Sequence, residues 1–119
     1  MTGMETDLEK MRQRIVTFCE ARNWAQFHNP KDLAISLSLE AAEVLEHFQW
    51  KSPEEIKKHV VEHKDDVADE LIDVLYWVLL MSHYLDIDLP EAFDRKMNEN
   101  EHKYDVEKAK DKHTKYTEL

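Results

Sequence analysis

The chain has 119 residues, a formal net charge of −10 and 42% hydrophobic residues. This length fits one domain, residues 1–119, close to the size at which small proteins often gain by oligomerising. The acidic balance argues against a general binder of nucleic acid or of anionic membranes, because both need a basic surface. A bound polyanion would need metal ions as mediators.

The composition is that of an all-α protein. One Gly and three Pro are too few for the turns of an all-β fold, while good helix formers are abundant. Cys19 is the single cysteine, so an intrachain disulfide is excluded and a reducing cytoplasm is the expected setting. We expect its side chain to pack in the core. No signal peptide begins the chain, and the longest apolar run, residues 74–81, is shorter than the about 20 residues that span a bilayer. We therefore expect a soluble, cytoplasmic protein.

Two helices are predicted in the first part of the chain. Apolar residues recur there at helical spacing, at Leu8, Met11, Ile15, Phe18 and Cys19. The pattern predicts an amphipathic helix over residues 5–22 and a connector over 23–29. Asn29 and Pro30 form a cap and first-turn pair, which predicts a second helix from Pro30 to about Phe48.

The second half begins with a capping box at Ser52-Pro53-Glu54-Glu55, which predicts a short helix that ends in the polar segment 59–66. A long third main helix is predicted over residues 65–85. It is apolar on nearly every side after Asp73, which implies burial against several neighbours.

Asp88-Leu89-Pro90-Glu91 caps a fourth main helix that runs toward Lys103, and residues 105–119 are expected to form a loosely ordered tail. The expected fold is therefore all-α and four-helix bundle-like, completed by homo-oligomerisation.

Paired carboxylates are the main chemical signal. Glu40 and Glu43 lie one turn apart on the second predicted helix, and Glu70 and Asp73 repeat this spacing on the third. Like charges on one helix face are destabilising, whereas a shared cation would turn them into ligands. If the two helices pack antiparallel, four carboxylates converge on a site suited to Mg²⁺ or Mn²⁺. Asp66 and Asp69, one turn earlier, are candidates for an outer ligand.

Other interpretations compete with this metal site. Each carboxylate pair alone reads as a solvated helix face. The Glu-x-x-His spacing of di-iron bundles occurs at residues 99–102, although such a bundle needs two of these motifs. Residues 59–63 match the H-x-x-E-H of one class of zinc peptidases, which need a further ligand and a larger scaffold. A Gly-rich phosphate loop is excluded, because Gly3 is the only glycine.

The pattern of carboxylates resembles the E-x-x-E…E-x-x-D signature of MazG-like, all-α nucleoside triphosphate pyrophosphohydrolases, and is most similar to their dCTP pyrophosphatase branch. The second pair begins 27 positions after the first pair ends. Further segments that resemble this branch are residues 24–30 (WAQFHNP), 48–52 (FQWKS), 88–90 (DLP), 96–97 (KM) and 115–119 (KYTEL). The resemblance covers roughly residues 10–119.

The resemblance implies hydrolysis of a nucleoside triphosphate, with dCTP or a related dNTP as the first candidate, to a monophosphate and pyrophosphate in nucleotide-pool control or cleansing. It implies that Glu40, Glu43, Glu70 and Asp73 bind Mg²⁺ or Mn²⁺, and our choice for the base that deprotonates the attacking water is Glu43. Further family positions that contact phosphate are Lys96, Asn100, Lys103 and Tyr104.

Base recognition should use aromatic rings, and the candidates are Trp24, His28, Trp50 and Trp77. A Trp in a small helical protein also serves as a core residue. Trp77 stands where close relatives carry Tyr, so the base preference stays open. The resemblance also implies dimers paired into a homotetramer. The alternative from another functional class is a catalytically silent helical module for protein interaction.

Overall fold

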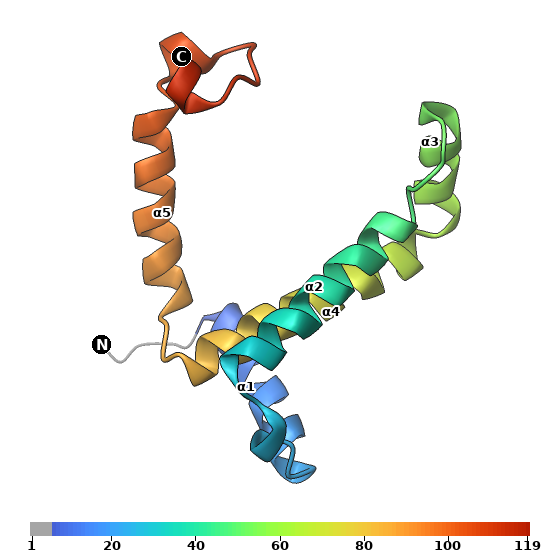
Figure 1. Ribbon diagram of the computed structural model, residues 1–119, viewed down its shortest axis with the longest axis vertical. Coiled ribbons are helices and arrows are strands. Elements are labelled where there is room, and N and C mark those ends of the chain that lie inside the picture. Colours follow the sequence, from blue (N-terminus) through green and yellow to red (C-terminus); the bar gives the residue numbers. More distant parts are fainter. Residues whose placement is uncertain (1–5) are drawn as a thin grey trace. The chain divides into compact units, whose positions relative to one another are not determined.

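The computed structural model describes residues 6–119, and over this range all regular structure is helical, with no β-strand (Figure 1). The first helix, α1 (Asp7–Ala21), begins after Thr6, whose hydroxyl accepts a hydrogen bond from the Glu9 N–H. The all-α prediction is confirmed. Residue 5, where we expected this helix to begin, lies outside the described residues.

Helix α2 (Pro30–Glu46) begins where the sequence predicts, because the Asn29 side chain accepts a hydrogen bond from the Asp32 N–H. It ends two residues before Phe48, and the chain then turns through residues 47–50. The connector before α2 contains a single 3₁₀ turn, η1 (Ala25–Phe27).

Helix α3 (Pro53–Glu62) starts with the predicted capping box, in which Ser52 and Glu55 each bond the other's backbone N–H. This exchange satisfies two amide donors that a helix start leaves free. The predicted break falls at His63, and the long helix α4 (Lys64–Tyr84) follows at once.

Asp88 caps helix α5 (Leu89–Lys103) by accepting a hydrogen bond from the Glu91 N–H. Short elements also occur in the last fifteen residues, where we expected a loosely ordered tail. They are α6 (Val106–Ala109), which Asp105 caps, and η2 (Tyr116–Glu118). Aromatic packing contributes there, since the Tyr116 ring meets the Tyr104 ring edge-on at 5.9 Å.

The contacts divide the described chain into two compact units, the first ending at Asp86 and the second spanning Ile87–Leu119. In the first unit α2 and α4 run antiparallel along each other, and α1 and α3 also pack against α4 (Figure 1). The core is small and consists of Val16, Cys19, Leu33, Leu79 and Leu80. Full burial of a Leu side chain contributes about 2 kcal/mol.

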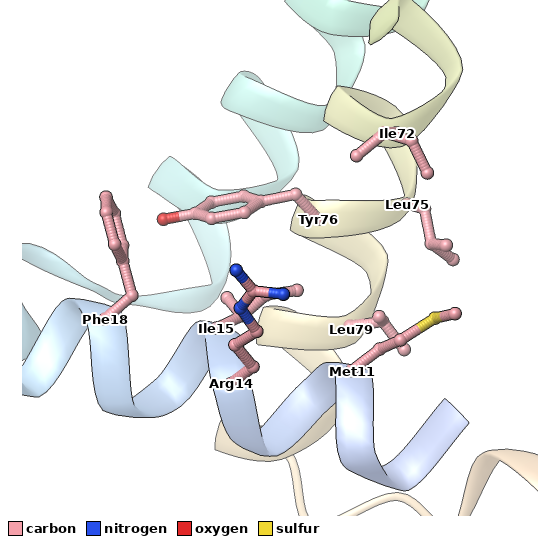
Figure 2. A pocket seen from close by; sticks show the side chains of 8 residues that line it. All are labelled: Met11, Arg14, Ile15, Phe18, Ile72, Leu75, Tyr76 and Leu79. Carbon is pink, nitrogen blue, oxygen red and sulfur yellow. The ribbon is translucent and has the colours of Figure 1, made fainter. Parts of the chain in front are cut away.

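A cavity of about 340 Å³ remains open between α1 and α4 (Figure 2). Its walls are largely apolar, and the residues that line it are Met11, Arg14, Ile15, Phe18, Ile72, Leu75, Tyr76 and Leu79. Several are well exposed, among them Ile72 at 58% and Met11 at 48%. None of the helices within residues 6–119 is long and apolar enough to cross a membrane.

Candidate functional site

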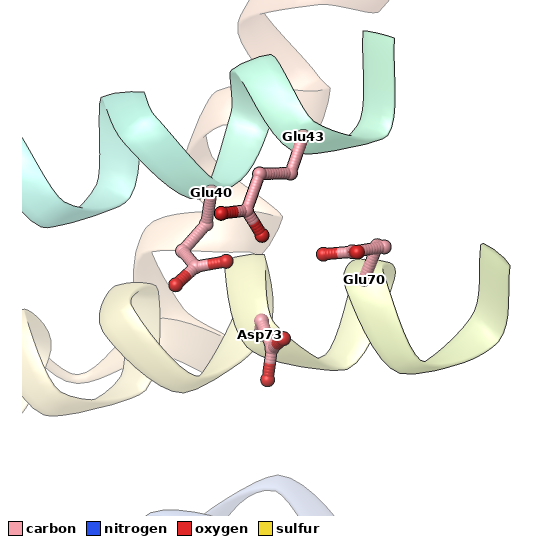
Figure 3. Close-up of side chains that lie close together, drawn as sticks. All are labelled: Glu40, Glu43, Glu70 and Asp73. Atoms are coloured by element: carbon pink, nitrogen blue, oxygen red, sulfur yellow. The ribbon is translucent and has the colours of Figure 1, made fainter. Parts of the chain in front are cut away.

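The four carboxylates singled out in the sequence lie together in the structure. Glu40 and Glu43 project from one face of α2, and Glu70 and Asp73 project from the facing side of α4 (Figure 3). One oxygen from each side chain lies within 4.8 Å of the others. The antiparallel packing of α2 and α4 produces this convergence, because the i, i+3 pair of each helix faces the pair of the other.

Crowding of like charges shifts the protonation of this cluster. Burial raises the pKa of Glu40, and the neighbouring carboxylates, Glu43 first among them, raise it further. The pKa of Glu70 is raised chiefly by the adjacent side chain of Glu43, and burial adds to the effect. Both shifts mean that the ionised cluster is unfavourable without a compensating positive charge.

Two buried oxygen atoms of the cluster indicate that a positively charged partner is missing. The Oε2 atoms of Glu40 and Glu70 are buried, and neither has a hydrogen-bond partner within the described chain. A buried polar atom without a partner is costly, and native proteins rarely keep one without a reason. A divalent cation would satisfy both atoms, and carboxylate oxygens are the ligands that Mg²⁺ and Mn²⁺ prefer.

The spacing of the ligand atoms also suits a hard cation. Opposite oxygens around a magnesium ion are about 4 Å apart, close to the spread of this cluster. Within residues 6–119, these carboxylates form the one group of three or more His, Cys, Asp or Glu side chains close enough for a metal ion. The H-x-x-E-H and Glu-x-x-His segments form no such group there, and neither Asp66 nor Asp69 joins the cluster.

A histidine that the sequence analysis did not single out stands beside the carboxylates. The Nε2 atom of His47 lies 4.0 Å from Oε1 of Glu70, the oxygen opposite the unpartnered one. Its Nδ1 atom is hydrogen-bonded to Nε2 of His59 at 2.9 Å. The signal was available, because His47 follows Glu43 by four residues and so shares its helix face.

A second cavity, of about 260 Å³, lies where η1 and the start of α2 meet α4. It includes three of the four aromatic candidates, and the residues that line it are Trp24, Phe27, His28, Asp32, Leu33, Ser36 and Trp77. The ring of His28 meets that of Trp77 edge-on at 6.4 Å, and its Nδ1 atom is hydrogen-bonded to the Tyr84 hydroxyl at 2.9 Å. Burial lowers the pKa of His28 and raises that of Tyr84.

Three polar residues at this second site were missed in the sequence: Asp32 and Ser36, which line the cavity, and Tyr84, which is hydrogen-bonded to His28. Asp32 and Ser36 are one turn apart on α2, and Tyr84 lies seven residues, or two turns, after Trp77 on α4. The spacing from Trp77 was therefore a signal for Tyr84, whereas His28 precedes α2 and its position beside Asp32 depends on the fold.

The fourth aromatic candidate, Trp50, does not line the cavity of about 260 Å³. Its side chain is 91% exposed, and its backbone is left-handed with a φ of 67°. Trp50 lies in the turn between α2 and α3.

The four candidate phosphate contacts lie in the second unit. Lys96, Asn100 and Lys103 share one face of α5, and Tyr104 ends it. Both lysines reach Glu99, with Nζ to Oε1 distances of 3.7 Å for Lys96 and 2.8 Å for Lys103. Their approach to the carboxylate cluster stays a prediction.

Residues 35–119 match the MazG-like family. The dCTP pyrophosphatase 1 of Rattus norvegicus is 36% identical over 117 residues, which are 97% of this chain and 69% of that relative. The Homo sapiens dCTP pyrophosphatase 1 is 35% identical over the same shares. A pyrophosphatase from Archaeoglobus fulgidus has a similar crystal structure, with a TM-score of 0.80 and 36% identity over 88% of this chain and 98% of that one. All four clustered carboxylates fall within the matched residues.

Proposed function

The chain belongs to the MazG-like family of nucleoside triphosphate pyrophosphatases, and we propose that it hydrolyses dCTP or a related deoxynucleoside triphosphate with the help of magnesium ions. The bond broken is the one between the α- and β-phosphates, and the products are a deoxynucleoside monophosphate and pyrophosphate. Such a reaction serves to control or cleanse the nucleotide pool.

The observation that carries the proposal is the convergence of Glu40, Glu43, Glu70 and Asp73 within 4.8 Å. A chain with a net charge of −10 repels a triphosphate. The four carboxylates would bind the cation that reverses this repulsion locally, and the unpartnered oxygens of Glu40 and Glu70 support this role. A catalytically silent interaction module has no need of such a cluster.

One of the four cation ligands, Glu43, is also our candidate for the base. Magnesium, when bound, neutralises phosphate charge and acidifies water. Glu43 is exposed and lies next to Glu70, so its carboxylate is accessible to a water molecule at the cluster. We assign it the removal of a proton from the water that attacks the α-phosphorus, in addition to binding the cation together with Glu40, Glu70 and Asp73.

The cavity of about 260 Å³ is our candidate for the base pocket. Trp24 and Trp77 offer ring surfaces on which a base can stack, which contributes about 1–3 kcal/mol. His28, Asp32 and Ser36 add polar atoms to the same walls. dCTP is the first candidate substrate because the relatives named above are dCTP pyrophosphatases.

Residues outside this cavity would complete the site. We assign Trp50 to the wall of the pocket, and Lys96, Asn100, Lys103 and Tyr104 to contacts with the phosphates. Trp50 is exposed in a backbone conformation that only glycine adopts freely, and neither burial nor local preference explains it. A functional contact accounts for both features.

We further propose that the chain acts as a homotetramer built from two dimers. The exposed apolar residues around the cavity between α1 and α4 support this assembly, because a partner copy would cover them (Figure 2). A symmetric interface on this face would also bring further side chains to the pockets.

Incubation of the purified protein with a panel of nucleotides and Mg²⁺ tests the proposed function. We expect pyrophosphate to be released, with dCTP among the best substrates, and a loss of at least about a thousandfold in Glu43→Gln and Asp73→Asn. Glu62→Gln is the matched control, because Glu62 is exposed on α3, where it forms a surface ion pair with Lys58.

Two results would contradict the proposal. Absence of pyrophosphate with every nucleotide, with no difference between the variants, would favour the interaction module. Release of inorganic phosphate alone would indicate a phosphatase.

A further inference from the structure

The hydrogen bond between His28 and Tyr84 orients a group in the candidate base pocket. The two rings are 5.3 Å apart and inclined by 62°, and Nδ1 of His28 lies 2.9 Å from the Tyr84 hydroxyl. On another side the His28 ring meets Trp77 at 89°. Contacts with two aromatic rings and one hydrogen bond restrict the rotation of the imidazole.

The direction of this hydrogen bond follows from the chemistry of its two groups. A neutral imidazole carries one N–H and one bare nitrogen. A phenol is the stronger donor of the two, and the bare imidazole nitrogen is the stronger acceptor. The Tyr84 O–H therefore donates to Nδ1, and the single ring proton of His28 is on Nε2. Burial supports this arrangement, because it lowers the pKa of His28 and raises that of Tyr84, which favours two neutral groups.

The position of the cavity then decides what Nε2–H can meet. His28 lines the cavity of about 260 Å³, whereas Tyr84 does not. Nδ1 faces Tyr84, so the opposite edge of the ring, which carries Nε2, is the edge available to a ligand. The same walls include Asp32, whose Oδ2 accepts a hydrogen bond from the Asn29 amide at 2.7 Å and whose second oxygen can accept one from a ligand.

We propose that Tyr84 is a positioning residue that fixes His28 in the Nε2–H tautomer, so that this N–H donates to an acceptor on the bound base. The proposal rests on the proposed function for the identity of the ligand. A donor at His28 and an acceptor at Asp32 together select a base whose acceptor atom adjoins an exocyclic amine. They disfavour a base that presents a carbonyl at the position of that amine.

The tautomer can be measured directly in the free protein. Long-range proton–nitrogen NMR spectra of nitrogen-15-labelled histidine distinguish a protonated Nε2 from a protonated Nδ1. We expect His28 to have its proton on Nε2 in the wild type and to become a mixture of tautomers in Tyr84→Phe. This substitution retains the ring and removes only the hydroxyl.

Steady-state kinetics test the consequence for recognition. In Tyr84→Phe we expect the KM of the best nucleotide to rise by about three- to tenfold, the effect of one misplaced hydrogen bond, with kcat within about twofold. The preference among bases should weaken by a similar factor. Tyr76→Phe is the control, because it also retains the ring and removes only a hydroxyl, and Tyr76 does not line this cavity.

Substitution of His28 gives an independent test. The amide nitrogen of Gln lies about where Nε2 of His lies, whereas that of Asn lies near Nδ1. His28→Gln should therefore retain more base discrimination than His28→Asn, and Tyr84→Phe should add little in the His28→Gln background.

The outcomes separate the two proposals. A proton on Nδ1 of His28 in the wild type, unchanged discrimination in Tyr84→Phe, or better discrimination in His28→Asn than in His28→Gln would each overturn the role of Tyr84. A protein that hydrolyses no nucleotide contradicts the proposed function instead, and the tautomer, read without a nucleotide, distinguishes the two failures.

Discussion

The four clustered carboxylates have oxygens within 4.8 Å of one another. Repulsion between their charges destabilises the metal-free protein. The raised pKa values of Glu40 and Glu70 have the sign expected for groups whose ionised form is destabilised by folding. Sites that bind strongly charged ligands often lower the stability of the free protein in this way. A substitution that removes one charge should therefore affect stability and metal binding in opposite directions.

Glu40→Gln tests this opposition. In the presence of a chelator we expect its melting temperature to exceed that of the wild type by about 3–6 °C, the effect of about 1 kcal/mol in a domain of this size. Added Mg²⁺ or Mn²⁺ should raise the melting temperature of the wild type and leave that of the variant unchanged. Calorimetric scans with and without metal measure both effects, and equal responses of the two proteins to metal would exclude Glu40 as a ligand.

The lowered pKa of His28 leads us to expect that the stability of the protein depends on pH. Burial lowers its pKa in the folded protein below the about 6.5 of an unfolded chain, so the unfolded state binds a proton first as the pH falls. The contribution of His28 is therefore fully present above about pH 6.5 and is lost as the pH falls from there through the folded pKa. Urea unfolding across this range should show a steeper loss for the wild type than for His28→Gln. Parallel dependence of stability on pH in the two proteins would contradict a lowered pKa of His28 in the folded state.

At the scale of elements, the turn between α2 and α3 carries an unusual conformation. Trp50 has a φ of 67° there, and a left-handed backbone costs a non-glycine residue about 1 kcal/mol or more. Its side chain is 91% exposed and gains nothing from burial within the described chain. Strain of this kind persists where the residue has a function.

Trp50→Gly separates the backbone strain at residue 50 from the contact of its side chain with the nucleotide. The variant should be more stable by about 1 kcal/mol, because glycine adopts the left-handed conformation freely. Its KM for the nucleotide should rise by about tenfold through the loss of a stacking surface. Asp86→Gly is the matched control, since Asp86 is also left-handed with a φ of 53°, and it should leave KM unchanged. A KM in Trp50→Gly equal to that of the wild type would remove Trp50 from the pocket.

The helices were predictable because their signals are local. The caps at Asn29, Ser52 and Asp88 each act on an amide within three residues. The early end of α2 and the short elements after Asp105 were not predicted. They depend on turn geometry and on contacts between aromatic rings, which composition does not reveal.

In the candidate site, too, local features were predictable and contacts between elements were not. The carboxylate cluster was predictable, because the i, i+3 spacing places each pair on one face of its helix, and like charges on one face indicate a shared cation. The spacing of His47 from Glu43 was visible in the sequence, but its contact with Glu70 and the bond from Tyr84 to His28 were not predictable, since each joins residues from different elements. Such pairings depend on the relative rotation of two helices, which sequence periodicity does not fix.

At the scale of the whole molecule, apolar surface remains exposed around the cavity between α1 and α4. Light scattering coupled to gel filtration should give about four times the chain mass of 14.2 kDa. Met11→Lys should lower this mass to that of smaller species, because it places a charge on the exposed apolar face. Gln13→Lys adds the same charge to an exposed residue of α1 that does not line the cavity, and should leave the mass unchanged. Equal masses for the two variants would exclude this face as the interface.

We propose that the carboxylate cluster directs water to the α-phosphorus. Hydrolysis of dCTP in oxygen-18 water, followed by mass spectrometry of both products, tests it most directly. We predict that one labelled oxygen enters dCMP and none enters pyrophosphate, and that a chelator abolishes the reaction. Label in pyrophosphate would show attack at the β-phosphorus instead, and full activity with the chelator present would exclude a role for the metal.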